Sequence, residues 1–385
     1  MKSHWLSLTA AATAVVVVGF ASTILIIMQA AQAIGASPAQ QASFAASLCY
    51  MMAITTFVLC WRYKMPIITA WSTPGAVLVA ASAGLTYQSA LGAFVVAGAL
   101  MVLTGLVKPL ERAIERMPSA IAAAMLAGVL VGYVLKVPAA GLSAPLLVVP
   151  LVIAFFRVRM IYPMYAVPVV VALGLVLAVI SGGMGQGCCS LGLTPLTVDM
   201  PRFELSAALG LGVPLYLVTM ASQNLPGFVV LRASGYQPPV GPSLVVTGLA
   251  SMFMAPFGGH AVNMAAITAS LATGHDVHPD PTLRWKVAYP YAIIYVAIAL
   301  AATSFVSILG ALPKELVAAI AGLALFSPLM SGMVTMMKDA KDVEAAMVTF
   351  LVTASGMAMF GVGAAFWGLV AGMMIWGLKR VIAKQ

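Results

Sequence analysis

Charged residues are scarce in this sequence of 385 residues. Asp, Glu, Lys and Arg together make up 8% of the chain, hydrophobic residues make up 62%, and the mean hydropathy is +1.06. Soluble globular domains carry about 25% charged residues, so the composition excludes a soluble fold, and it equally excludes disordered, coiled-coil and collagen-like chains. The alternating pattern of a transmembrane β-barrel is also missing. The sequence therefore predicts an all-α polytopic membrane protein without a soluble domain.

Cysteine is also rare, and its spacing gives no framework for metal ions or disulfides. Cys49 and Cys60 lie in an apolar stretch and are interpreted as packing residues. Cys188 and Cys189 are adjacent, which suits neither an ordinary disulfide nor a zinc site. We therefore expect no metal and no cofactor. The net charge of +9 is interpreted as a topology signal in short loops, so nucleic acid is not expected as a partner.

The gaps between charged residues predict 14 membrane spans. No charged residue lies between Lys2 and Arg62, a gap that holds two spans broken near Gly35–Pro38, and the same reasoning gives seven spans before residue 200 and seven after it. The first span is interpreted as retained, not as a cleaved signal peptide. With both termini in the cytoplasm, the basic residues lie in cytoplasmic segments, as the positive-inside rule requires. The three exceptions are Lys136, Arg202 and Lys314.

A weak internal repeat accompanies this seven-plus-seven count. A shift of 192 residues pairs Met28–Gly35 with Met220–Gly227, and it pairs Pro66–Gly75 with Gly258–Ile267. Because seven is odd, the second copy would enter the membrane upside down. The prediction is an inverted repeat of residues 1–190 and 191–385, a plan typical of secondary transporters, in which interrupted helices meet near the bilayer midplane.

Polar side chains occur at only a few places in the predicted spans, and none of them is charged. All ten carboxylates lie in loops or at span ends, which argues against a cation transporter and against a carboxylate proton relay. The amide side chains among the polar residues have a second interpretation, in which they only form hydrogen bonds between neighbouring helices. The four clusters are Gln29 with Gln32, Ser222-Gln223-Asn224, Thr69–Gly75, and Gly258–Met264.

Spans 3 and 10 are each expected to consist of a short strand followed by a half-helix. The β-branched run ending at Thr69 indicates extended backbone, Ser72 or Thr73 is the expected N-cap, and Pro74 is the expected first helical residue. By the repeat, Asn263 would cap the matching half-helix. Two facing N-termini with free N–H groups would form an anion site without Arg or Lys.

Single residues near this site have two interpretations each. His260 is the one histidine inside a predicted span, and it is either a packed residue or a proton carrier. Trp71 either packs or borders a flat apolar substrate, and Met264 is a further candidate contact. The G-x-x-x-G pairs Gly128/Gly132 and Gly368/Gly372 indicate close helix packing more than a dimer face. Lys108–Arg116 is expected to form an amphipathic helix on the membrane surface.

The segments Met220–Phe228 and Pro256–Asn263 resemble the bacterial benzoate membrane transporter family, whose members are described as benzoate/proton symporters. The resemblance extends over essentially the whole chain. The family is similar in fold to the uracil/proton symporter and to the seven-plus-seven anion exchangers. This implies a core domain of about residues 8–107 and 205–310, a gate domain of about residues 117–181 and 313–380, substrate between them, and commonly a homodimer.

The uracil symporter is known for glutamates in its spans 8 and 10, and this sequence departs from it there. The matching positions here offer Gln223, Asn224 and Asn263. An anionic benzoate would be repelled by a carboxylate, so amides fit the implied substrate. The proton would then travel either on His260 or on the substrate itself as neutral benzoic acid.

These observations together predict a transporter in the bacterial inner membrane that takes up an aromatic carboxylate, benzoate, with protons. The alternatives are a transporter of another planar or anionic substrate (a nucleobase or an inorganic anion), a passive channel, and a membrane-embedded enzyme. An enzyme is disfavoured because the sequence lacks the buried acid or the set of metal ligands that it would need. The expected substrate-binding residues are Gln29, Thr69, Trp71, Ser72, Thr73, Gly75, Gln223, Asn224, His260, Asn263 and Met264.

Overall fold

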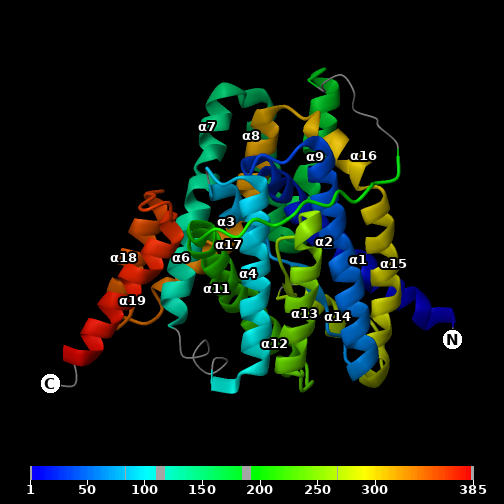
Figure 1. Cartoon of the computed structure of the whole chain (residues 1–385). Helices are drawn as coiled ribbons and strands as arrows, with labels where there is room; N and C mark the ends of the chain where they lie inside the picture. Colours follow the sequence, from blue (N-terminus) through cyan, green and yellow to red (C-terminus); the bar gives the residue numbers. More distant parts are fainter. Residues whose placement is uncertain (1, 83, 110–117, 184–191, 267, 383–385) are drawn as a thin grey trace.

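The computed structural model describes residues 2–82, 84–109, 118–183, 192–266 and 268–382. Most of them belong to helices that are gathered into one bundle (Figure 1). Two sequence predictions concern residues outside this description. They are the adjacent cysteines Cys188 and Cys189 and most of the amphipathic helix expected over Lys108–Arg116.

The first half of the chain passes from two long helices through a short strand to a second group of helices. The break between the first two helices falls where Gly35–Pro38 predicts it, because Ser37 and Gln40 form a capping box and Pro38 occupies the first turn of the second helix. The elements are α1 (Lys2–Ala33), α2 (Pro38–Tyr63), β1 (Thr69–Trp71), α3 (Thr73–Ala81), α4 (Tyr87–Leu106), α6 (Ser119–Val134), α7 (Lys136–Ser143), α8 (Pro145–Ile161), the 3₁₀ turn η1 (Pro163–Tyr165) and α9 (Ala166–Ile180).

The second half repeats this plan with more interruptions. Its elements are α10 (Leu205–Ala207), η2 (Ala208–Gly212), α11 (Val213–Thr219), η3 (Met220–Asn224), α12 (Leu225–Ala233), α13 (Val240–Met254), η4 (Ala255–Phe257), β2 (Val262–Met264), α14 (Ala269–Thr273), η5 (Pro281–Val287), α15 (Ala288–Leu300), α16 (Ala302–Gly310), α17 (Lys314–Met336), α18 (Val343–Ala354) and α19 (Ala364–Ile382).

Ten helical stretches of the described residues are long enough and apolar enough to cross a bilayer. Two shorter apolar stretches, Thr23–Ala33 and Val343–Ala354, accompany them. The helical polytopic class is therefore confirmed, whereas the total of 14 spans stays a prediction. The two expected interruptions are present, since β1 precedes α3 and β2 precedes α14.

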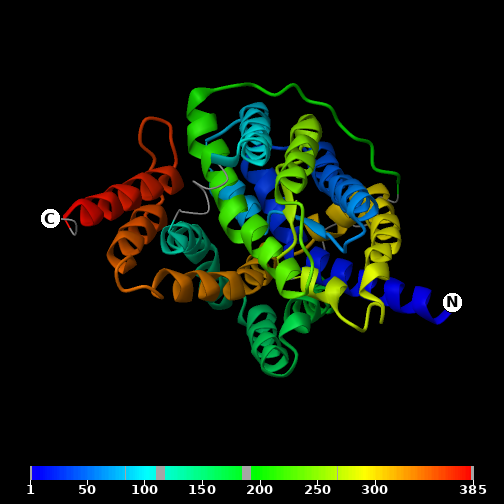
Figure 2. The same ribbon diagram turned by 90° about the horizontal axis from the view of Figure 1, so that it is seen from below.

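The helices pack in two groups. In one group α4 packs on α13, α2 on α15 and α1 on α3, and in the other α17 and α18 both pack on α6 while α18 packs on α19. Figure 2 shows α18 and α19 at one side of the bundle, away from α15. The groups touch where α1 meets α9 and α17 and where α3 meets α6. This grouping parallels the predicted core and gate domains. That the two groups move relative to each other stays a prediction.

Glycines set the closest helix contacts. A Cβ on Gly98 would lie 2.9 Å from the Gly248 carbonyl oxygen, and one on Gly105 would lie 2.6 Å from that of Gly241, so α4 and α13 touch backbone to backbone. The G-x-x-x-G pair Gly368/Gly372 packs against Thr353 and Thr349 of α18 inside the chain. This confirms the packing interpretation for that pair and removes it as a dimer face. Gly128 likewise packs against Thr353, whereas Gly132 faces open space.

Two π-helical segments, η2 and η3, widen the helix that runs from α10 to α12. In η3 the Leu225 amide donates to the Met220 carbonyl five residues back, and in η2 the Val213 amide donates to Ala208 in the same way. Each segment is followed two residues later by a proline, Pro226 or Pro214. A proline ring clashes with the carbonyl four residues before it, and the wider π turn relieves that clash.

Candidate functional site

The two strands form an antiparallel pair that joins the two halves of the chain. Ala70 lies opposite Asn263, with Thr69 opposite Met264 and Trp71 opposite Val262. Beyond the ladder, the Ser72 amide donates to the Ala261 carbonyl and the Ala265 amide donates to the Ile68 carbonyl. Ser72 and Ala265 thus occupy equivalent places, one residue after each strand. The two halves therefore correspond here at a shift of 193 residues, one more than the sequence alignment used.

Side chains from neighbouring helices bond the outer edge of β1. The Thr69 amide donates to Thr56 Oγ1 at 3.0 Å and the Trp71 amide donates to Met52 Sδ at 3.1 Å, both from α2. Tyr291 of α15 donates its hydroxyl to the Thr69 carbonyl at 2.6 Å. In lipid an unpaired backbone group costs several kcal/mol, which explains why hydroxyls and a thioether surround a three-residue strand.

The outer edge of β2 is bonded in the same manner. The Val262 amide donates to Ser251 Oγ of α13 at 3.0 Å, and the Met264 amide donates to Asn224 Oδ1 at 2.9 Å. Asn224 Nδ2 also contacts Met220 Sδ at 3.3 Å. Asn224 and Met264 are both buried, so in this conformation Asn224 supports the strand, and Met264 packs in the core.

Ser72 caps α3, as one of the two sequence alternatives predicts. Its Oγ accepts from the Gly75 amide at 3.0 Å and its carbonyl accepts from the Ala76 amide at 2.8 Å. The helix itself begins at Thr73, so Pro74 is its second residue and not its first. Since Pro74 has no N–H, the Thr73 amide is the one left in this turn without a partner among the described residues. A helix N-terminus leaves such an amide available to water or to a ligand.

Two hydroxyls that the sequence analysis missed surround this N-terminus. Thr219 of α11 donates to Ser72 Oγ at 3.1 Å, and Thr23 of α1 lies 2.9 Å from Thr73 Oγ1. Thr219 directly precedes the Met220–Asn224 motif, and that adjacency is the signal that could have found it. Among the described residues, the start of α3 is thus lined by four hydroxyls and no charged group: those of Thr23 on α1, Thr219 on α11, the cap Ser72 and Thr73 of α3 itself.

His260 lies directly behind the cap. Its Nε2 is 2.9 Å from the Ser72 carbonyl oxygen, and because a carbonyl only accepts, Nε2 carries the hydrogen. The ring is fully buried, stacks on Phe44 at 5.6 Å and lies edge-on to Phe94 at 6.1 Å. His260 therefore contacts the site through the Ser72 backbone.

The second half-helix differs from the expectation. Helix α14 has five residues, its first turn follows Thr268, and no side chain caps it. The prediction that Asn263 caps it is wrong, because Asn263 lies inside β2, with its amide nitrogen 3.1 Å from the Ala70 and Met264 carbonyl oxygens when it is oriented to donate. The residue equivalent to Ser72 is Ala265, which has no hydroxyl. The electropositive N-terminus of this site is therefore that of α3.

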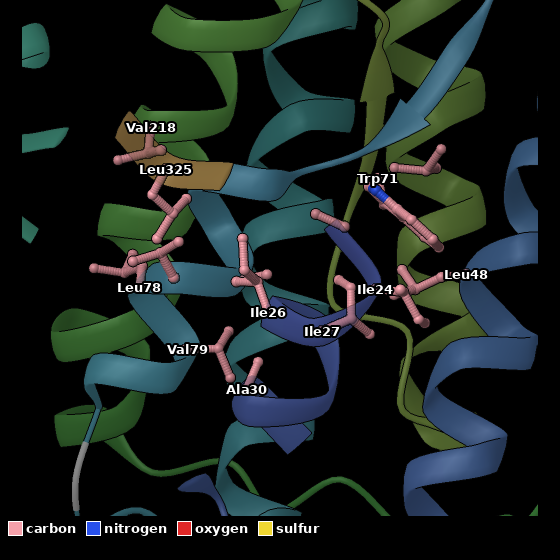
Figure 3. Packing of buried hydrophobic residues seen from close by; sticks show 14 of the residues in the cluster. Ile24, Ile26, Ile27, Ala30, Leu48, Trp71, Leu78, Val79, Val218 and Leu325 are labelled. Atoms are coloured by element: carbon pink, nitrogen blue, oxygen red, sulfur yellow. The ribbon is translucent and has the colours of Figure 1, made fainter. Parts of the chain in front are cut away.

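Three further predicted residues make no hydrogen bond to the start of α3 in the described part of the chain. Gln29 and Gln223 are half-buried, and neither bonds to Ser72 or Thr73 in the described part of the chain. Trp71 is 3% exposed and packs against Phe20 at 5.8 Å and Tyr295 at 6.4 Å between ring centroids. Figure 3 shows its ring among the buried apolar side chains. In this conformation Trp71 is a packing residue.

The fold and the site together define a class of protein. Apolar helices that are interrupted at matched places in two halves, with a free helix N-terminus among hydroxyls, are the arrangement of membrane transporters with internal repeats. The chain matches the family model described as benzoate membrane transport protein over residues 2–378. It belongs to that family.

Curated relatives support the assignment over nearly the full length. The inner membrane protein YdcO of Escherichia coli (strain K12) is 36% identical over 371 residues, which are 96% of this chain and 95% of that protein. The benzoate membrane transport protein of Acinetobacter baylyi is 32% identical over 376 residues, 97% of this chain and 95% of that protein. The family resemblance seen in the sequence is thereby confirmed.

Solved structures share the fold at low sequence identity. The transmembrane domain of the cyanobacterial bicarbonate transporter BicA aligns with a TM-score of 0.64 at 16% identity and covers 97% of this chain and 98% of that one. The murine anion transporter Slc26a9 in its inward-facing state aligns with a TM-score of 0.64 at 12% identity, over 100% of this chain and 69% of that one. These similarities establish the fold and no more.

Proposed function

We propose that this protein is a secondary active transporter that takes up benzoate, or a closely similar aromatic carboxylate, together with protons across the bacterial inner membrane. Membership of the family supports the substrate class, and one relative carries benzoate in its name. The orientation with both termini in the cytoplasm and a homodimeric assembly belong to the same proposal.

The observation that carries the proposal is the acid-free, hydroxyl-lined N-terminus of α3. The Thr73 amide and the Ser72 hydroxyl, which accepts from Gly75 and Thr219 and has its own hydrogen left to donate, offer donors to a carboxylate. The Thr73 hydroxyl becomes a third donor when its bond with Thr23 is exchanged for one to the substrate, and the α3 dipole adds about 0.3–1 kcal/mol, up to about 2 when partly buried. A hydrogen bond to a charged group contributes about 1.5–3 kcal/mol. Three such contacts suffice for a small anion, and no Arg or Lys has to be buried to make them.

The transport cycle in this proposal moves two bodies past each other. In this proposal the core body comprises α1–α4 and α10–α16, and the gate body comprises α6–α9 and α17–α19. The site would face the boundary between them, where α1 packs on α9 and α17 and α3 packs on α6. Apolar side chains such as Val218 of α11 and Leu325 of α17 belong to the buried cluster in this region (Figure 3). Separation of the bodies would open the α3 N-terminus to one side of the membrane at a time.

Two routes remain for the proton. It could bind His260 Nδ1. Because the same ring bonds the Ser72 carbonyl through Nε2, its positive charge would then lie next to the substrate site. Alternatively it could travel on the substrate as neutral benzoic acid. A second candidate function is transport of an inorganic anion such as bicarbonate, which the fold shared with BicA favours, and a nucleobase is a further alternative.

Reconstituted protein tests the proposal directly. Liposomes with an inward proton gradient should accumulate labelled benzoate above equilibrium, and unlabelled benzoate should compete whereas uracil and bicarbonate should not. Empty liposomes correct for passive entry of benzoic acid. Competition by bicarbonate alone would favour the inorganic anion, and equilibration without accumulation would indicate a channel.

A further inference from the structure

Two buried polar atoms near His260 have no partner in the structure. Among the described residues, Tyr87 Oη and His260 Nδ1 are both enclosed by protein without a hydrogen bond. The side chains are 5% and 0% exposed, respectively. An unpaired buried polar group is costly, and native proteins keep few of them, so each needs an explanation.

Both atoms border the same short segment of chain. At Gly258, whose φ of +102° suits glycine, a Cβ would lie 2.8 Å from Tyr87 Oη and 3.0 Å from Phe44 Cα. Two residues later, the His260 ring stacks on the Phe44 ring. The Tyr87 hydroxyl and the His260 imidazole therefore both lie beside Phe44 of α2. Tyr87 is the first residue of α4 and lies nearer to the end of the bundle where that helix begins.

A carboxylate lies at that end of the bundle. The Asp199 amide donates to the Pro256 carbonyl at 2.9 Å, and Gln40 Nε2 donates to Asp199 Oδ2 at 3.0 Å, so the carboxylate is held over the ends of α2 and η4. It is half-buried, and Pro256, to which its backbone is bonded, lies two residues before Gly258, the glycine beside Tyr87 Oη. The sequence places this segment on the periplasmic side of the membrane.

The surroundings of His260 contain no competing acid. No Asp, Glu or Lys occurs in α2, α3, α4, α13 or β1. The basic residue in these elements is Arg62, at the far end of α2. Tyr87 is the titratable group that α4 contributes. On the periplasmic side of His260, Asp199 supplies a carboxylate and Tyr87 an unpaired hydroxyl, and both can pass on a proton.

We propose that Asp199, Tyr87 and His260 form the proton-entry route of the transporter, an inference that rests on the proposed symport. Asp199 takes a proton from hydronium and leaves water. The Tyr87 oxygen accepts that proton while its own hydroxyl proton passes on, through a bridging water, to His260 Nδ1. The imidazole becomes a cation, and its Nε2–H stays on the Ser72 carbonyl. One positive charge then lies behind the N-terminus that binds the carboxylate, which couples proton entry to substrate binding.

Removal of a single hydroxyl tests the route. Tyr87→Phe keeps the ring and deletes the relay atom, and Tyr216→Phe is the matched control, because Tyr216 is a buried tyrosine that also packs on α4 and bonds Thr104. Purified variants in liposomes that contain a pH-sensitive dye allow two measurements. One is benzoate uptake and internal acidification under a proton gradient, and the other is exchange of labelled for unlabelled benzoate at equal pH.

Tyr87→Phe should slow gradient-driven uptake and acidification by about 100-fold or more, in the range that one acid–base group contributes, while exchange stays near the wild-type rate. Tyr216→Phe should leave both rates unchanged. Wild-type proton uptake by Tyr87→Phe, or an equal loss of exchange, would overturn the route. If Tyr87→Phe fails to fold, Asp199→Asn gives the same readouts and keeps the bond to Gln40. Absence of benzoate transport by the wild type would instead refute the proposed function.

Discussion

Replacement of Thr73 by valine removes one proposed ligand from the substrate site at nearly constant shape. In the structure Thr73 Oγ1 bonds to Thr23 Oγ1 at 2.9 Å, and the Thr73 side chain is half-buried at the first turn of α3. A hydrogen bond between two neutral hydroxyls contributes about 0.5–1.5 kcal/mol to stability, whereas one donated to a carboxylate contributes about 1.5–3 kcal/mol. The variant should therefore lose more in substrate binding than in folding.

The expected result for Thr73→Val is a rise of about 10- to 100-fold in the KM for benzoate, because each 1.4 kcal/mol corresponds to a factor of ten. The thermal unfolding temperature should fall by only a few degrees. Initial rates of labelled benzoate uptake into liposomes give the KM, and tryptophan fluorescence on heating gives the unfolding temperature.

Thr247→Val is the matched control for this experiment. Thr247 is a buried threonine whose hydroxyl bonds the Ser243 carbonyl of its own helix, α13. It should leave the KM unchanged. If Thr73→Val transports benzoate with the wild-type KM, the α3 N-terminus does not bind the carboxylate and the site lies elsewhere.

Three further substitutions give distinct outcomes. Asn263→Asp should abolish benzoate uptake, since its carboxylate would face two backbone carbonyls and repel the substrate; uptake at the wild-type rate would show that Asn263 lies outside the site. His260→Gln keeps a donor for the Ser72 carbonyl and deletes the second ring nitrogen, so proton-driven uptake should fall while equal-pH exchange persists, and unchanged proton flux would assign the proton to the substrate. Gly248→Val should lower the unfolding temperature strongly, because its side chain would meet the Gly98 carbonyl at 2.8 Å, with a cost of about 1–3 kcal/mol from overpacking; a melting curve like that of the wild type would contradict the close contact of α4 and α13.

The sequence predicts the elements of the site that depend on local chemistry. The β-branched run before Thr69, the hydroxyl of Ser72 and the ring of Pro74 each restrict their own stretch of backbone, so the strand, the cap and the half-helix follow from neighbouring residues. The interruption of span 3 was predictable for the same reason, that of span 10 was predicted through the internal repeat, and the family could be recognised from two motifs.

Other parts of the site depend on contacts between distant segments and could not be predicted. Thr23 and Thr219 meet Thr73 and Ser72 only after α1, α3 and α11 have packed. The one sequence signal for these contacts is the position of Thr219 directly before the Met220–Asn224 motif, and Thr23 has none. The error at Asn263 has a simple origin, since the repeat is so weak that an alignment off by one residue looked equally good. In a strand, a shift of one residue moves a side chain to the opposite face.

The pairing of Ala70 with Asn263 also has a consequence for biosynthesis. The partner of the first strand is made 193 residues later, which at about 5–20 residues per second takes the ribosome roughly 10–40 s. Throughout that interval the inner edge of β1 lacks its partner. Thr56 and Met52 of α2 can already bond its other edge, whereas Tyr291 is made only after β2. The two-stranded sheet that carries the site can therefore form only after most of the chain has been translated.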